Sequence, residues 1–190
     1  MKENKYDDNI FFQKYSQMSR SQQGLAGAGE WETLRKLLPD FKDKRVLDLG
    51  CGYGWHCIYA MENGASSVVG VDISHKMLEV AKEKTHFPQV EYKCCAIEDV
   101  EFPEESFDVI LSSLAFHYVA DYEILVKKIY RILKSGGKLV FTVEHPVFTA
   151  YGTQDWHYNE KGEILHFPVD NYYYEGKRTA VFLGEKVTKS

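Results

Sequence analysis

A glycine-rich turn directly after an apolar segment is the feature that most limits what this chain can fold into. Residues 45–50 form a short apolar run that predicts a buried strand, and the run ends in Gly50-Cys51-Gly52-Tyr53-Gly54. Glycine adopts positive φ without steric cost and lets a ligand approach the backbone closely. A helix is predicted for residues 54–63, and the free N–H groups at its start attract an anionic group. The sequence therefore predicts a ligand-binding loop between a strand and a helix.

Strand-like and helix-like segments alternate through the middle of the chain. Further strands are predicted at residues 67–73, 90–96, 107–111 and 138–143, and further helices at residues 74–85 and 121–133. Ser74 is the expected N-cap of the first of these helices. Strands separated by helices are typical of a parallel sheet with helices on both faces, so the predicted fold class is α/β.

Two flanking regions are expected to belong to the same domain as this core, because a length of 190 residues suits one domain. Residues 1–40 carry two predicted helices, at about residues 7–17 and 23–38, which would form an N-terminal helical lid. Residues 41–147 form the core. Residues 148–190 are rich in aromatic side chains and predict loops and short strands that act as a covering segment, with strands near residues 164–167 and 179–183.

The composition argues against several classes of protein. No apolar run approaches the roughly 20 residues that a membrane-spanning helix needs. The polar N-terminus shows no signal peptide, so a cytoplasmic protein without a membrane partner is expected. The net charge of −5 disfavours a nucleic-acid partner, because nucleic-acid binders usually carry a basic face. The four cysteines have no C-x-x-C spacing, and no metal site is expected.

The spacing of the glycines separates two kinds of nucleotide cofactor. A nicotinamide- or flavin-binding turn reads G-x-G-x-x-G, so its third glycine would stand where this chain has Trp55. Here the spacing is G-x-G-x-G, preceded two residues earlier by Asp48. Asp72 ends the second predicted strand, 22 residues after Gly50, where a carboxylate can accept hydrogen bonds from both hydroxyls of a ribose. A nicotinamide-dependent oxidoreductase is therefore only an alternative interpretation.

Five segments, taken together and in this order, resemble the class I S-adenosylmethionine-dependent methyltransferases, and especially their small-molecule branch, which includes the ubiquinone and menaquinone biosynthesis methyltransferases. They are residues 46–54, 69–77, 96–103, 107–118 and 133–143. The resemblance implies a Rossmann-like, doubly wound, mostly parallel sheet. It also implies methyl transfer by direct displacement from S-adenosyl-L-methionine to a small-molecule acceptor, with S-adenosyl-L-homocysteine as the product. A non-catalytic protein that keeps this fold and binds the cofactor is the main alternative.

The resemblance also implies which residues hold the cofactor. The methionine part would lie against Asp48, Gly50, Cys51 and Gly52, the ribose against Asp72, and the adenine against Ile73, Met77, Ala96, Ile97 and Glu98. Ser112, Ser113 and His117 follow the fourth strand, where relatives contact the methionine part and the transferred methyl group. Many relatives have Gly-Asp at the place of Cys94-Cys95, so the contact with the adenine amino group is expected to pass to Glu98 or to the backbone.

Three residues are the main candidates for a general base, which an oxygen or nitrogen nucleophile can require, and His56 is a further candidate. The main candidates are His117, Glu144 and His145, and the last two directly follow the fifth strand, at the edge where a substrate would lie. Histidine has the reference pKa closest to neutrality. The alternative role for Glu144 and His145 is to anchor the loop that follows them.

The end of the chain departs from the family pattern. The family sheet has seven strands, with a final antiparallel hairpin beside the fifth, whereas only five convincing strands precede residue 146 here. We therefore expect a C-terminally shortened form whose fifth strand is an uncovered edge. An uncovered edge offers unpaired backbone groups to another chain, so a homodimer through this strand is predicted.

Overall fold

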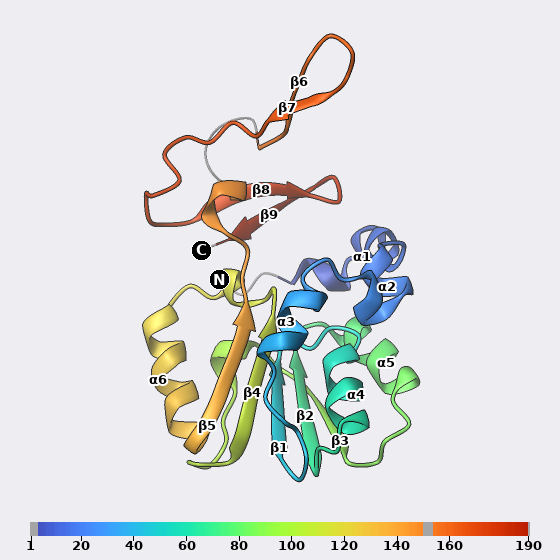
Figure 1. Cartoon of the computed structure of the whole chain (residues 1–190), viewed down its shortest axis with the longest axis vertical. Helices are drawn as coiled ribbons and strands as arrows, with labels where there is room; N and C mark the ends of the chain where they lie inside the picture. The colour runs from blue at the N-terminus through green and yellow to red at the C-terminus, as the bar shows by residue number, and fades with distance from the viewer. Residues whose placement is uncertain (1–3, 150–153, 190) are drawn as a thin grey trace.

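The computed structural model describes residues 4–149 and 154–189, and its centre is a five-stranded sheet (Figure 1). The strands are β1 (Arg45–Leu49), β2 (Ser67–Asp72), β3 (Val90–Cys94), β4 (Phe107–Ser113) and β5 (Leu133–Thr142). They lie in the order β3-β2-β1-β4-β5, and every neighbouring pair is parallel. The order reverses at β1, because the chain first runs outward to β3 and then returns to β4. This confirms the predicted α/β, Rossmann-like sheet.

Helices cover both faces of this sheet (Figure 1). They are α4 (Trp55–Glu62), α5 (His75–Lys84) and α6 (Tyr122–Ile132). Alternate residues of β1 point to opposite faces, so Leu47 joins the apolar cluster under α6 and Val46 joins the cluster under α4. No helix in the described part of the chain combines the length and the apolar character that crossing a bilayer requires.

The helix ends follow local sequence signals in two places and depart from them in a third. The Ser74 side chain accepts a hydrogen bond from the Met77 amide and caps α5, as predicted, and Asp121 caps α6 in the same way. However, α6 continues directly into β5, which begins at Leu133 rather than at residue 138. Gly136 takes φ +76° inside this strand, so the predicted stop signal is part of an irregular strand start.

The N-terminal region consists of short helices that lie over the carboxyl ends of the strands (Figure 1). They are η1 (Lys5–Asp7), α1 (Asn9–Ser16), α2 (Ser19–Gln22), η2 (Gly24–Gly27) and α3 (Trp31–Leu37). The prediction of one helix over residues 23–38 was wrong. Gly24 takes φ +62°, and a Cβ on Gly27 would lie 2.3 Å from the Ser19 carbonyl oxygen. Glycines therefore divide this segment into two short pieces.

The C-terminal region forms two antiparallel hairpins beyond the same edge of the sheet (Figure 1). It contains η5 (Pro146–Thr149), β6 (His157–Tyr158), β7 (Ile164–His166), β8 (Arg178–Phe182) and β9 (Glu185–Lys189). The Phe182 ring packs on the Phe11 ring of α1 at 5.8 Å, and Lys14 Nζ donates to the Leu183 carbonyl at 2.9 Å. The β8–β9 hairpin therefore meets the N-terminal helices above the sheet. The sequence predicted strands near β7 and β8 but not β9.

The outer edge of β5 is the surface through which the predicted homodimer would form. Within residues 4–149 and 154–189, β5 pairs with β4 on one side and with no strand on the other. Phe141 and Val143 are 37% and 48% exposed near its end. We expect sedimentation velocity to show a dimer that dissociates when Phe141 and Val143 are both replaced by lysine, because charges on an edge strand oppose pairing. A wild-type protein that sediments as a monomer at all concentrations would contradict this prediction.

Candidate functional site

A cavity of about 400 Å³ lies at the carboxyl ends of β1, β2 and β4, which is where open α/β sheets bind ligands. Its volume is within the range of small-molecule sites, about 300–1,000 Å³. Most of the sequence-predicted residues line it: Gly50, Gly52, Asp72, Ile73, Met77, Ala96, Ile97, Glu98, Ser113, His117 and Glu144. The N-terminal helices and the β8–β9 hairpin contribute further wall residues: Tyr6, Tyr15, Met18, Arg20, Glu30, Phe182, Val187 and Lys189. The cavity is thus enclosed by segments far apart in the sequence.

The glycine-rich turn after β1 is held against β2 by its own backbone. The amides of Gly50 and Cys51 both donate to the Val71 carbonyl oxygen, at 2.8 and 2.9 Å. Gly50, Gly52 and Gly54 take φ values of +80°, +52° and +75°, which only glycine adopts at low cost. The turn therefore presents bare backbone to the cavity and leads directly into α4.

Asp72 links this turn to the start of α5. One carboxylate oxygen accepts from the Gly52 amide at 2.9 Å, and the other accepts from the Ser74 amide at 2.9 Å. Burial raises the pKa of Asp72, and the two amide hydrogen bonds oppose the rise. An acceptor-only group therefore stands on the cavity wall between the glycine turn and an apolar slot.

The apolar slot beside Asp72 is made by Ile73, Met77 and Ile97. The N-terminal segment closes one side of it, because Asn4 Nδ2 donates to the Ile73 carbonyl oxygen at 3.3 Å. Asp7 then accepts from Ser74 Oγ at 2.6 Å at the start of α5. A flat apolar group bound here would have the Asp72 carboxylate at its edge.

Four of the sequence-predicted residues lie behind the cavity or beside it: Asp48, Cys51, Ser112 and His145. Asp48 is 0% exposed, and one of its oxygens accepts from the Cys57 thiol at 3.5 Å. Its other oxygen has no hydrogen-bond partner in the described part of the chain. Ser112 Oγ donates to the Leu49 carbonyl oxygen at 2.8 Å, so it braces the strand before the turn.

The burial of Asp48 makes stability depend on pH. Burial raises its pKa to about 7, and the neighbouring Asp72 charge adds to the rise. The carboxyl is therefore protonated in the folded state below about pH 7, whereas in the unfolded state it ionises at its ordinary, lower pKa. The stability that comes from this difference is present at low pH and is lost as the pH rises through about 7. We expect the free energy of unfolding to fall by about 1 kcal/mol more between pH 6 and pH 7 in the wild type than in Asp48→Asn. Urea titrations at several pH values measure the free energy of unfolding. An equal dependence on pH in the wild type and in Asp48→Asn would contradict the prediction.

Glu30 is a wall residue that the sequence did not single out. It forms an ion pair with Arg20 and accepts from Ser113 Oγ at 3.1 Å. Burial raises its pKa, but hydrogen bonds and the Arg20 charge outweigh this effect and hold the pKa below the usual value. Glu30 lies immediately before α3, in the segment that was predicted as continuous helix, so no local signal marked it.

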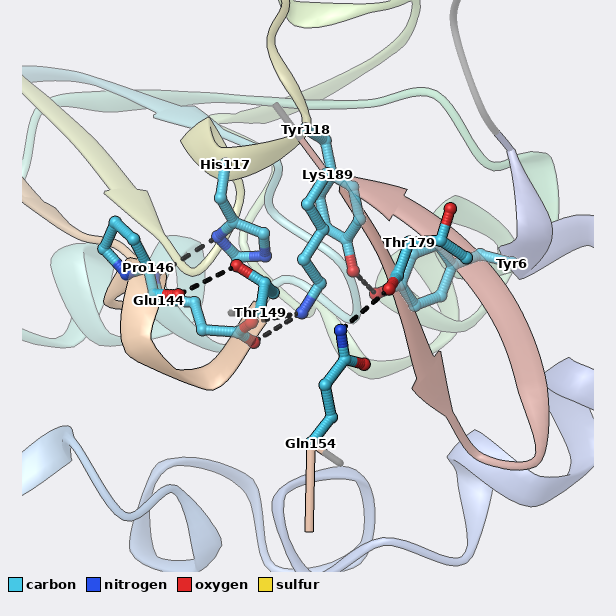
Figure 2. Close-up of polar contacts among 9 residues, drawn as sticks. All are labelled: Tyr6, His117, Tyr118, Glu144, Pro146, Thr149, Gln154, Thr179 and Lys189. Atoms are coloured by element: carbon cyan, nitrogen blue, oxygen red, sulfur yellow. Dashed lines mark hydrogen bonds and ion pairs between the residues drawn. The ribbon is translucent and has the colours of Figure 1, made fainter. Parts of the chain in front are cut away.

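His117, Glu144 and Lys189 meet on the opposite wall (Figure 2). The Glu144 amide donates to His117 Nδ1 at 3.4 Å, and Lys189 Nζ donates to the Glu144 carboxylate at 2.6 Å. Burial and the Lys189 charge lower the pKa of His117 to about 4, although Glu144 opposes the shift. Lys189 was not predicted, because it reaches the site only through the β8–β9 hairpin. We call these three side chains the neck.

The neck also lines a second cavity of about 360 Å³. Its other walls include the exposed His145, the tyrosines Tyr172, Tyr173 and Tyr174, and Glu175. Arg178 holds this wall in place, since its guanidinium donates to the Pro146 carbonyl at 3.0 Å and to the carbonyls of Tyr172 and Tyr174. The neck thus separates two adjoining spaces, one beside the glycine turn and one beside aromatic rings.

The residues around the first cavity fit a nucleoside with a charged amino-acid tail. The slot suits an adenine, Asp72 suits ribose hydroxyls, and the glycine turn allows close backbone approach. In residues 4–149 and 154–189, no group of three His, Cys, Asp or Glu side chains is arranged to hold a metal ion.

Comparison with known proteins decides between the possible cofactors. The sequence profile of the methyltransferase domain matches residues 47–141. The chain belongs to the class I S-adenosylmethionine-dependent methyltransferases. S-adenosylmethionine is therefore the cofactor, and the interpretation as a nicotinamide-dependent oxidoreductase is excluded.

Proteins similar to this methyltransferase match it over more than half of its length. A crystal structure from Listeria monocytogenes, assigned to the same class, is 56% identical with TM-score 0.78, covering 85% of this chain and 76% of its own. An S-adenosylmethionine dependent methyltransferase from Mesorhizobium loti is 41% identical with TM-score 0.75, covering 82% of this chain and 70% of its own. A ubiquinone biosynthesis O-methyltransferase of Coxiella burnetii is 35% identical over 58% of this chain and 47% of its own length.

Proposed function

We propose that this methyltransferase acts on a small-molecule acceptor. The observation that carries the proposal is the pair of adjoining cavities, about 400 and about 360 Å³, which share the neck residues. Cavities of this size suit small ligands, and three tyrosines give the second one an aromatic wall. The likeness to a protein named for ubiquinone biosynthesis supports an acceptor of this class.

The turn, the slot and Asp72 would hold the cofactor so that its methyl group faces the neck. When bound, S-adenosylmethionine supplies a methyl group that its positive sulfur already activates for displacement. Direct displacement would pass this methyl group to the acceptor and would leave S-adenosylhomocysteine as the product. The chain itself contributes alignment, which can supply roughly 7–11 kcal/mol of a barrier, and it excludes water.

The three candidate catalytic residues would take different parts. We propose that His117 and Glu144 touch the acceptor, because both line the first cavity as well as the second. His145 lines only the second cavity, and its Nδ1 accepts from the Val147 amide at 3.3 Å. We therefore propose that His145 shapes the acceptor space and anchors the loop after β5.

We also propose that nucleic acids are not the acceptor. The net charge of −5 supports this, and so does the roof of N-terminal helices and β8–β9 residues over the first cavity. The predicted cytoplasmic location stays a prediction.

A labelled methyl group tests the acceptor class directly. The protein is incubated with S-adenosylmethionine carrying a tritiated methyl group and with a cell extract divided by ultrafiltration into small molecules and macromolecules. We expect label in products of the small-molecule fraction only, and none with an Asp72→Ala variant. Label that stays with nucleic acid or protein would overturn the proposal. Calorimetry with S-adenosylhomocysteine verifies that the protein used binds the cofactor product.

A further inference from the structure

The position of the proton on His117 follows from its hydrogen bond. The Glu144 backbone amide can only donate, so His117 Nδ1 must carry the lone pair that accepts at 3.4 Å. A neutral imidazole with a lone pair on Nδ1 carries its proton on Nε2. His117, which lines both cavities, therefore offers them an N–H donor and not a proton acceptor.

The charged groups around His117 keep the ring neutral. Lys189 approaches from β9 and Glu144 from the segment after β5. The Tyr118 ring lies tilted against the imidazole, with the ring centroids 4.4 Å apart. Burial of the ring and the Lys189 charge disfavour an imidazolium, and together they outweigh Glu144, which favours one. The ring thus stays neutral near pH 7.

Lys189 adds a second donor to the neck. An ammonium group has three N–H donors, and Lys189 uses two of them on the two oxygens of Glu144. The Lys189 side chain is 8% exposed and lines both cavities, so its remaining donor serves whatever occupies them. The neck therefore offers two N–H groups and no free carboxylate.

We propose that the neck binds an oxygen of the acceptor, either a carboxylate or a carbonyl or phenolate oxygen, through His117 Nε2–H and Lys189 Nζ–H. This inference rests on the proposed function and specifies its substrate class. A carboxylate, carbonyl or phenolate oxygen can accept from both donors through its lone pairs. An ammonium or amidinium group has only donors and would be left facing two further N–H groups. It follows that His117 is not the general base.

The predicted protonation of His117 is tested without any acceptor. Nitrogen NMR of the full-length protein, isotopically labelled at histidine, measures it. We expect the His117 signal to show a neutral ring with its proton on Nε2 at pH 7, and charging only well below pH 6. Lys189→Met should raise the pH at which His117 charges, because it removes a cation and frees Glu144. Lys186→Met, on the exposed side of the same strand, is the matched control and should change nothing. A proton on Nδ1, or a charged ring at pH 7, overturns the proposal.

The recognition part is tested with three probes of one shape, added to the protein saturated with S-adenosylhomocysteine. They are benzoate, benzamide and benzamidine. We expect benzoate to bind most tightly and benzamidine not to bind, because only an oxygen can accept from both donors. His117→Phe and the charge-neutral double variant Lys189→Met with Glu144→Gln should each weaken benzoate binding at least tenfold, since a hydrogen bond to a charged group contributes about 1.5–3 kcal/mol. Benzamidine binding as tightly as benzoate, or unchanged binding in His117→Phe, overturns the inference.

Titration with S-adenosylhomocysteine distinguishes a failure of the proposed function from a failure of the inference about the neck. A protein that fails to bind S-adenosylhomocysteine contradicts the proposed use of the first cavity. A protein that binds it, yet prefers benzamidine, leaves the methyltransferase intact and contradicts the recognition of an oxygen by the neck. The exposed His86→Phe variant is the control for loss of a histidine and should bind benzoate like the wild type.

Discussion

Replacing Asp72 by alanine is expected to weaken the binding of S-adenosylhomocysteine by about a hundredfold or more. Hydrogen bonds to a charged group contribute about 1.5–3 kcal/mol each, and the Asp72 carboxylate is placed to accept two from a ribose. The variant also loses the two amide contacts, to Gly52 and Ser74, that set the cavity wall. Isothermal calorimetry with the cofactor product measures the change.

Two further variants separate the charge of Asp72 from its shape. Asp72→Asn keeps one oxygen acceptor, so we expect an affinity between those of the wild type and Asp72→Ala. Glu79→Ala removes an exposed carboxylate from α5, the helix that Asp72 precedes, and should bind like the wild type. A thermal melt of each variant shows whether it is folded. Wild-type affinity in a folded Asp72→Ala protein would remove the main support for the ribose site.

Local sequence was sufficient to predict which residues around the glycine turn meet at the first cavity. The turn after β1, the cap at Ser74 and the carboxylate at Asp72 are all set by residues a few positions apart. Parallel strands bring their carboxyl ends to one edge, so separate local signals meet there without knowledge of the tertiary contacts. This is why the sequence predicts the sheet, and why most of the residues expected to hold the cofactor line one cavity.

The part of the site where we propose that the acceptor binds could not be predicted in the same way. Glu30 and Lys189 enter the site from the N-terminal helices and from β9, and neither belongs to a recognisable motif. Glu144 and His145 looked equivalent in the sequence because both follow β5. In the structure only Glu144 reaches the first cavity, and His145 lines the second one alone. Tertiary contacts alone make this distinction.

Gly50, Gly52 and Gly136 all have positive φ. Alanine substitutions at these three positions separate two causes of lost stability, backbone strain and overpacking. A Cβ on Gly50, at φ +80°, would lie 2.4 Å from the Ala115 Cβ, which is too close for any real contact. Gly50→Ala is therefore expected to lower the free energy of unfolding by about 3 kcal/mol or more. Left-handed strain of about 1–2 kcal/mol and overpacking of about 1–3 kcal/mol together account for this loss. Urea titration measures it.

Gly52→Ala and Gly136→Ala supply the matched comparisons. Both positions have positive φ, +52° and +76°, and neither new Cβ would meet a protein atom within 4 Å. Each variant should therefore lose only the strain, about 1–2 kcal/mol. Gly52 lines the first cavity, so its new methyl group would occupy space proposed for the cofactor and should weaken S-adenosylhomocysteine binding. Gly136 lies inside the outer strand β5, so its substitution should not change this binding. If Gly52→Ala bound the cofactor product like Gly136→Ala, the cofactor would not approach the turn as closely as its glycines allow.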